Sequence, residues 1–420
     1  MRRFRRPPRT LIATVAVLAG LLLAATPASA APGDWWQFGY TAAHTRANPN
    51  ESTINQQNVA TLGIAAQQRP RLEIDLGAGH DAADAGALAV ANGLAYANAW
   101  NYEGGTSALL AYDTGSFQAP AAWRQERVGC AGRSPAVHLG IVFVGSFPCR
   151  PSAANGALRA FDGASGRLLW SYTANEEVGT VSATGGVVYV SASDSLYQTS
   201  YDLLALDAHS GAVIWRVKPG QHTGDPAVAG GRVFVGTAGG RLQARSAATG
   251  ALLWSRPGAG LLGSPAVTGG VVYSLGTENG ASRLFARRAG TGALVWKRPL
   301  PGQLTGAWPA VAGGRVLAST SAGISAFDAA SGASRWRATV AGASSPAVAN
   351  GLVFAGLASG IGAWRLSDGV RRWTYGTIAY GDPTVSGGRL YVPAFTAAGD
   401  QPFVLLDQFA LGAAAPGAVS

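Results

Sequence analysis

The sequence predicts an all-β fold, an eight-bladed β-propeller of four-stranded blades, because two short motifs recur along the chain. The first is a turn followed by a short strand that ends in tryptophan, as in residues 162–170. The second is a Pro-Ala-Val segment followed by a two-residue turn that contains glycine. Repeats of roughly 40 to 50 residues that are rich in strand patterns are typical of propeller blades.

The tryptophan motif combines side chains that favour a turn with residues that favour a strand. Its Asp and Ser can bond nearby backbone N–H groups, and its Gly can adopt a positive φ. Seven copies, some of them imperfect, place tryptophans at spacings of 47, 45, 39, 42, 40 and 37 residues. Because the copies are equivalent, we expect a structural role between neighbouring sheets for Trp123, Trp170, Trp215, Trp254, Trp296, Trp336 and Trp373.

The glycine turns predict eight hairpins, because two-residue loops between apolar runs require positive φ. They lie at residues 92–93, 139–140, 185–186, 230–231, 269–270, 313–314, 350–351 and 387–388. The last unit has no tryptophan strand, whereas residues 59–76 contain a spare strand. We therefore expect this N-terminal strand to complete the eighth blade, which removes two exposed sheet edges. The alternative is a seven-bladed ring with an extra hairpin.

Residues 1–30 have the pattern of a signal peptide. Five arginines precede an apolar run at residues 11–25, and Ala28-Ser29-Ala30 fits a cleavage site. The run is shorter than the roughly 20 residues that span a bilayer, so we expect cleavage in preference to an uncleaved anchor, and general secretion in preference to the twin-arginine route. We expect a secreted protein that is not a lipoprotein, with one propeller domain at residues 31–411 and a flexible tail at residues 412–420.

The charge of the mature chain argues against nucleic acid as a partner. Removal of the leader leaves 27 basic and 22 acidic residues, a net charge of +5, and the arginines are scattered along the repeats. Nucleic-acid binding requires a concentrated basic face. We expect a monomer without a membrane span after cleavage.

The two cysteines are placed symmetrically about one predicted hairpin turn. Cys130 lies nine residues before Leu139, and Cys149 lies nine residues after Gly140. If the strands on either side pair, the two sulfurs meet at one end of the hairpin. We therefore expect a structural disulfide that contributes about 2 to 4 kcal/mol. Two free thiols or a redox site are the alternatives, and the lack of a Cys-x-x-Cys motif disfavours the second.

Polar residues that do not repeat lie in the loops that join one blade to the next, and we expect these loops to gather at one mouth of the central channel. Carboxylates from several blades suit a hard cation, and an arginine there suits an anionic ligand. Asp before Pro also commonly caps a turn, so a structural role stays open for several of them. The candidates are His80, Asp81, Asp84, Glu126, Arg133, Glu176, Glu177, His222, Asp225, Trp308, Tyr380 and Asp382.

Together, the two motifs resemble the pyrroloquinoline quinone (PQQ) repeats of the quinoprotein alcohol dehydrogenase-like propellers. The lead-in at residues 35–62 is similar to the N-terminus of polyvinyl-alcohol-dehydrogenase-like proteins. The resemblance covers nearly all of residues 34–411. This superfamily contains PQQ enzymes and also propellers that bind no quinone, including an outer-membrane assembly scaffold. The enzymes use a disulfide of adjacent cysteines against PQQ, and this chain has no adjacent cysteines.

The resemblance implies two functions, and whether the protein is an enzyme stays open. The preferred one is a secreted binding or scaffold propeller that holds a cell-envelope protein or polymer. The alternative is a PQQ- and Ca²⁺-dependent dehydrogenase of alcohols or polyols. In that case Asp225 or Asp382 is the catalytic base. The cofactor is bound by Arg133, Trp308 and His222, and the metal ion is bound by Glu177 and Asp81. Hydrolase and nucleotide-binding motifs are missing from the sequence.

Overall fold

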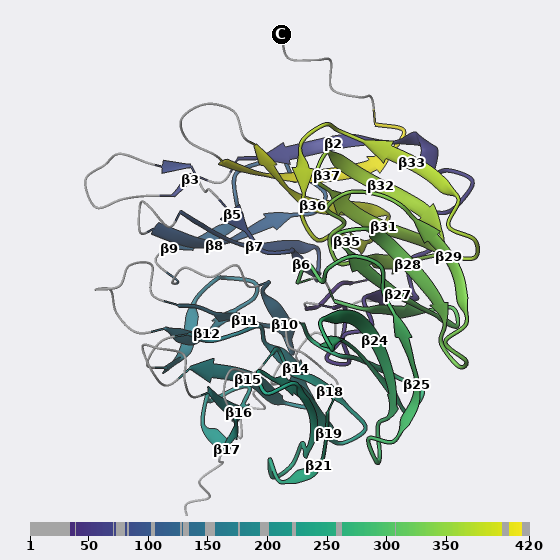
Figure 1. The fold of residues 1–420 in the computed structure, drawn as a ribbon. Coiled ribbons are helices and arrows are strands. Elements are labelled where there is room, and N and C mark those ends of the chain that lie inside the picture. The colour runs from purple at the N-terminus through teal and green to yellow at the C-terminus, as the bar shows by residue number, and fades with distance from the viewer. Residues whose placement is uncertain are drawn as a thin grey trace, which may run out of the picture.

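The strands close into a ring of blades around a central channel (Figure 1). This computed structural model describes residues 34–37, 39–69, 71–72, 80–81, 84–101, 106–126, 128, 134–147, 156–174, 177–193, 201–220, 224–257, 263–306, 308–396 and 403–413. Within these ranges the one helical element is a 3₁₀ turn, η1 (Val59–Thr61). No helix in the described ranges is long and apolar enough to cross a membrane.

The first four blades follow the predicted repeats. Blade 1 has β6 (Ala89–Ala91), β7 (Leu94–Asn101), β8 (Thr106–Asp113) and β9 (Trp123–Glu126). Blade 2 has β10 (Ala136–His138), β11 (Ile141–Gly145), β12 (Ala157–Asp162) and β13 (Leu168–Thr173). Blade 3 has β14 (Ser182–Thr184), β15 (Val187–Ser193), β16 (Tyr201–Asp207) and β17 (Val213–Gly220). Blade 4 has β18 (Ala227–Ala229), β19 (Arg232–Thr237), β20 (Arg241–Ser246) and β21 (Leu252–Pro257).

The other four blades complete the ring. Blade 5 has β22 (Ala266–Thr268), β23 (Val271–Glu278), β24 (Ala281–Arg288) and β25 (Leu294–Pro299). Blade 6 has β26 (Ala310–Ala312), β27 (Arg315–Thr320), β28 (Gly323–Asp328) and β29 (Ser334–Ala338). Blade 7 has β30 (Ala347–Ala349), β31 (Leu352–Leu357), β32 (Gly360–Arg365) and β33 (Arg371–Tyr375). Blade 8 has β35 (Thr384–Ser386), β36 (Arg389–Thr396), β37 (Phe403–Leu411) and β2 (Leu62–Gln68).

The eighth blade is completed by the N-terminal strand, as the sequence predicts. Strand β2 pairs antiparallel with β37, from Leu62 opposite Leu411 to Gln68 opposite Leu406. The first strands of the eight blades contact one another in sequence around the channel, and β35 of blade 8 contacts β6 of blade 1. The ring is therefore closed with eight blades.

Most short strands outside the blades pair with a blade strand, and one pair of them forms a separate two-stranded sheet. β1 (Ala47–Asn48) pairs with β30, β3 (Arg71–Leu72) pairs with β4 (His80–Asp81), β5 (Asp84–Ala85) pairs with β7, and β34 (Ala379–Tyr380) lies between β32 and β36. Within residues 59–76, where the sequence indicates a spare strand, the structure thus describes β2 and β3. Cys130 and Cys149 lie outside the described residues, so their disulfide stays a prediction.

The N-terminal segment, residues 35–37 and 39–48, bonds to the inner strand of every blade in turn. The partner is always the middle residue of that strand. Blades 1 to 3 are reached by Trp35 with Val90, Trp36 with Val137 and Gln37 with Ala183. Blades 4 to 8 are reached by Ala42 with Val228, Ala43 with Val267, Thr45 with Val311, Arg46 with Val348 and Asn48 with Val385. The segment thereby pairs backbone groups on the inner sheet edges that would otherwise face the channel unbonded.

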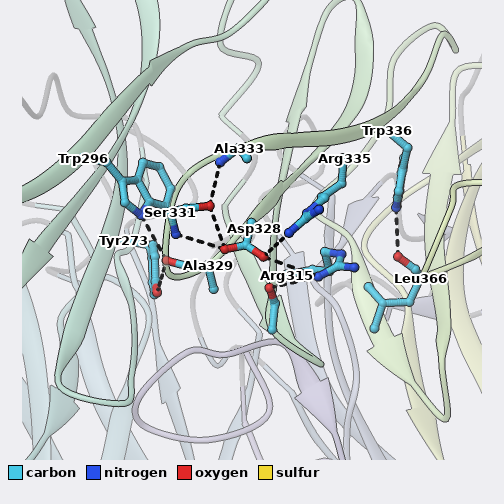
Figure 2. A network of polar contacts seen from close by, with 11 residues as sticks. Tyr273, Trp296, Arg315, Asp328, Ala329, Ser331, Ala333, Arg335, Trp336 and Leu366 are labelled. Carbon is cyan, nitrogen blue, oxygen red and sulfur yellow. Dashed lines mark hydrogen bonds and ion pairs between the residues drawn. The ribbon is translucent and has the colours of Figure 1, made fainter.

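The repeating tryptophans connect each blade to the next. In seven copies the indole Nε1–H donates to a backbone carbonyl of the following blade at 2.8–3.1 Å. Figure 2 shows two of these bonds, from Trp296 to Ala329 and from Trp336 to Leu366. Asp328 holds the turn beside Ala329, because its carboxylate accepts hydrogen bonds from the Ser331 N–H and hydroxyl at 2.9 Å.

The glycine of each turn is required by the tryptophan of the preceding blade. Gly332 has φ +70°, and a Cβ there would lie 2.6 Å from Cδ2 of Trp296. The same relation holds for Gly166, Gly211, Gly250, Gly292 and Gly369. A side chain at these positions would separate neighbouring blades.

We predict that Gly332→Ala lowers the free energy of unfolding by about 2 to 4 kcal/mol, the sum of the left-handed backbone penalty and overpacking against Trp296. The matched control is Gly314→Ala, because Gly314 has the same φ of +70° with no atom within 4 Å of its Cβ position. It should cost about 1 to 2 kcal/mol. Chemical denaturation of both variants measures the difference, and equal losses would show that contact with the indole contributes nothing.

Candidate functional site

One residue from each blade forms a ring at a mouth of the channel. Each lies two positions before the inner strand of its blade. We call this set the mouth ring: Ala87, Ser134, Thr180, Asp225, Ser264, Trp308, Ser345 and Asp382. Small and hydroxylated residues predominate, so the two aspartates and the tryptophan are the distinctive members.

A cavity of about 580 Å³ opens at this mouth. Six of the eight mouth-ring residues line it, all except Asp225 and Ser264. The remaining described lining comes mainly from glycine, alanine, serine and threonine of blades 1, 6 and 7, with Pro393 and Phe395 from β36. The cavity therefore combines two aromatic side chains with many small polar groups.

Side chains of the mouth ring bond backwards to the preceding blade. The Asp382 carboxylate accepts the Ser345 N–H at 2.8 Å, and Asp225 accepts the Thr180 N–H at 2.9 Å. The Ser264 hydroxyl donates to the Asp225 carbonyl at 2.7 Å. Both aspartates thus hold the blade before their own.

The N-terminal segment places two further polar side chains against the mouth ring. Arg46 is buried, donates to the carbonyls of Ser345 and Pro346, and lies 3.4 Å from the Asp382 carboxylate. His44 is also buried and bonds through Nε2 to the Ser182 hydroxyl at 2.7 Å and through Nδ1 to the Ser264 hydroxyl. Burial lowers the pKa of His44 to about 4, so the imidazole is neutral at pH 7.

Three of the sequence candidates that the structure describes belong to the mouth ring. Trp308 and Asp382 line the cavity. Asp225 is not in the described lining, and its carbonyl accepts a hydrogen bond from the Ser264 hydroxyl, which also bonds to His44. Glu177 lies before the inner strand of blade 3, and its carbonyl accepts the Ser193 N–H. Asp81 is in β4, with its side chain outside the description. Arg133 and His222 lie outside the described residues.

His44 and Arg46 are site residues that the sequence reasoning did not select. They lie in the lead-in, where the sequence indicates a loop, and the Thr-Arg-x-Asn-Pro pattern there was the available sign of a fixed role. Among the described residues, no group of three or more His, Cys, Asp or Glu side chains is arranged to hold a metal ion.

Another buried carboxylate lies where blade 8 is completed. Asp407 of β37 accepts hydrogen bonds from Tyr380 Oη at 3.0 Å and from Gln67 Nε2 of β2 at 2.7 Å. Burial raises the pKa of Asp407 to about 6. Tyr380, a candidate from the sequence, is therefore a partner of this carboxylate.

Comparison with known families matches the one described as outer membrane protein assembly factor BamB over residues 119–202, 155–375 and 324–408. The chain belongs to this PQQ-repeat propeller family. Comparison with curated proteins finds no match.

Solved structures show the same fold at low sequence identity. The quinohemoprotein alcohol dehydrogenase ADHIIG from Pseudomonas putida HK5 is 15% identical with a TM-score of 0.69, and 91% of this chain aligns with 81% of that chain. BamB from Moraxella catarrhalis is 19% identical with a TM-score of 0.61, covering 84% and 98% of the two chains. A europium-containing methanol dehydrogenase is 14% identical with a TM-score of 0.66, covering 91% and 98%. The fold is thus shared by an outer membrane protein assembly factor and by dehydrogenases.

His44 and Asp407 should give opposite pH dependences of stability. The folded pKa of His44 lies below its ordinary value of 6.5, so its contribution to stability is lost as pH falls from about 6.5 towards 4. The folded pKa of Asp407 lies above its ordinary value of 3.8, so its contribution is lost as pH rises from about 3.8 towards 6.

We predict that the free energy of unfolding rises more steeply with pH between about 4 and 6 in Asp407→Asn than in the wild type, and less steeply in His44→Gln. Each difference in slope should approach about 1.4 kcal/mol per pH unit. Urea denaturation at several pH values measures the slopes. Unchanged slopes in both variants would contradict the assignment.

Proposed function

We propose that this protein is an extracytoplasmic scaffold propeller that holds a cell-envelope partner on the outer wall of blades 2 to 5. The observation that carries the proposal is a set of exposed apolar side chains. In the described chain, eight large apolar side chains are at least 40% exposed, and seven lie on the outermost strands of four consecutive blades. These seven define the apolar wall: Leu168, Val213, Ile214, Leu252, Leu253, Leu294 and Val295.

A bulge in each outermost strand explains why consecutive residues are exposed together. In β21, for example, Trp254 pairs with Ala244 and Leu252 pairs with Arg245, so Leu253 has no partner in the register. The corresponding irregularity occurs in β13, β17 and β25. A bulge interrupts the alternation of side chains between the two faces, and the following tryptophan still turns inward.

The apolar wall is a property of these blades and not of the repeat. At the same position blade 6 has Ser334 and Arg335 on β29, and the bulge is present there too. The fold therefore accepts polar residues at this site. Large exposed apolar patches are typical of protein interaction surfaces, so the apolar residues of blades 2 to 5 favour a partner.

The net positive charge of the mature chain comes from the same part of the ring. Residues 177–299, in blades 3 to 5, contain 11 Lys and Arg against 6 Asp and Glu, whereas the rest of the mature chain contains 16 of each. Opposite charge accelerates association and selects partners. An acidic envelope partner with apolar side chains fits this wall best.

The described cavity is a poor fit for PQQ and Ca²⁺. PQQ carries carboxylates, which require cationic partners, and Asp382 is the one charged residue in the described lining. One Asp382 oxygen accepts the Ser345 N–H and the other faces Arg46. Ca²⁺ requires six to eight oxygen ligands. These residues support the scaffold function over the dehydrogenase.

To test the wall, a photo-reactive amino acid would replace Leu252 or, as a control, Ser334 in the exported protein. We predict a specific adduct from position 252 and none from position 334. A triple variant, Val213→Ser, Ile214→Arg and Leu253→Arg, introduces into the apolar wall the residue types of Ser334 and Arg335 in blade 6. It should lower the adduct yield from position 252 about tenfold, as expected for loss of interface anchors. Equal yields from positions 252 and 334 would refute the wall as the interface.

The dehydrogenase alternative has its own measurement. We predict that titration of the mature protein with PQQ and Ca²⁺ produces no saturable quenching of tryptophan fluorescence at micromolar concentrations and that a dye-linked alcohol assay shows no turnover. Saturable quenching with turnover would establish the dehydrogenase instead, and Asp225→Asn and Asp382→Asn would then identify the base.

A further inference from the structure

The cavity at the mouth ring is independent of the apolar wall and has the features of a ligand site. Its volume of about 580 Å³ is within the roughly 300 to 1,000 Å³ of small-molecule sites. Residues from blades 1, 2, 3, 6, 7 and 8 converge on it. The binding surface is therefore built from six blades of a closed ring, which holds it in a fixed shape.

Residues with hydroxyl side chains line this cavity. Ser134 and Thr180 are 5% and 3% exposed and both line the cavity. A hydroxyl group on a cavity wall can both donate a hydrogen bond to a ligand and accept one from it, so these two residues are suited to bind a hydroxylated ligand.

The aromatic side chains supply an apolar surface. Trp308 is half-buried, and its backbone N–H donates to the Ser345 hydroxyl at 3.2 Å, which fixes its position. Phe395 and Pro393 pack closely on Gly381, whose N–H donates to the Pro393 carbonyl at 2.9 Å. Flat aromatic faces beside hydroxyl groups suit a ring that has C–H groups on its faces and hydroxyls on its rim.

The charges at the described cavity lining favour a neutral ligand. Asp382 is the charged residue of the described lining, and the buried Arg46 guanidinium lies 3.4 Å from its carboxylate. This pair adds no net charge to the described lining, and a charged ligand would lose its hydration without a compensating partner among these residues. An anion would in addition meet the Asp382 carboxylate.

We propose that the mouth cavity binds a neutral, polyhydroxylated ligand of the size of one or two sugar rings, with Trp308 as the stacking surface and Ser134 and Thr180 as hydrogen-bonding groups. The Asp382 carboxylate, held by Arg46 and the Ser345 N–H, accepts from a ligand hydroxyl. Binding of this ligand requires neither a cofactor nor a reaction.

Three sugars that differ in charge test the proposal on the purified mature protein. Saturation-transfer NMR would measure the binding of D-glucose, D-glucosamine and D-glucuronate to the protein. Cellobiose would serve as the two-ring probe. We expect the neutral sugars to bind saturably and the two charged sugars to bind about tenfold or more weakly. A preference for glucosamine would overturn the proposal in favour of a cation site. A preference for glucuronate, or no binding of any probe at about 50 mM, the limit of weak affinity, would also overturn it.

Substitutions of cavity residues test whether the ligand binds in the cavity. Trp308→Ala should weaken cellobiose binding about tenfold, and Ser134→Ala, a minimal change that guards against misfolding, should weaken it about three- to tenfold. Trp296→Phe, between blades 5 and 6, is the control and should leave the affinity unchanged. Unchanged affinity in both cavity variants would refute the site. Because the apolar wall shares no residue with the cavity, failure here and failure of the scaffold function are separate results.

Discussion

The structure depends on how the inner edges of its eight sheets are bonded. A four-stranded blade has two edges, and the inner one faces a channel in which unpaired backbone groups are costly. The N-terminal segment bonds to every one of these inner edges at least once, from Trp35 in blade 1 to Asn48 in blade 8. The same segment carries His44 and Arg46 to the mouth ring. Sheet closure and the shape of the candidate site therefore have one origin.

Some positions of the repeat are the same in nearly every blade, whereas the positions of the apolar wall vary from blade to blade. Tryptophan and glycine positions between blades are nearly invariant within this chain, because each tryptophan must bond the next blade and each glycine must leave room for the indole. The two residues before the tryptophan face solvent, so the fold accepts leucines in blade 4 and Ser334 with Arg335 in blade 6. Residue changes at these two positions therefore leave the contacts of the tryptophan with the next blade in place.

The sequence predicted the fold where its evidence was local and repeated. The tryptophan motif and the glycine turns define strands and hairpins within a blade, and the missing eighth tryptophan strand located the closing strand within residues 59–76, where the structure has β2. The site was predicted in part. Trp308, Asp225 and Asp382 were identified as non-repeating residues, but their bonds to neighbouring blades depend on packing that one blade does not reveal. His44 and Arg46 were missed because their partners lie 138 and 300 residues away.

The pairing of β2 with β37 also determines when the protein can acquire its native structure. Contacting residues in this pair are separated by nearly the whole folded chain, as in the bond between Gln67 and Asp407, 340 residues apart. Such a contact forms only after a large loss of chain entropy, so topologies of this kind fold slowly. The ring cannot close around the blades synthesised first until the C-terminal strand β37 has been made. The polypeptide is therefore expected to remain incompletely folded until its C-terminal blade is synthesised.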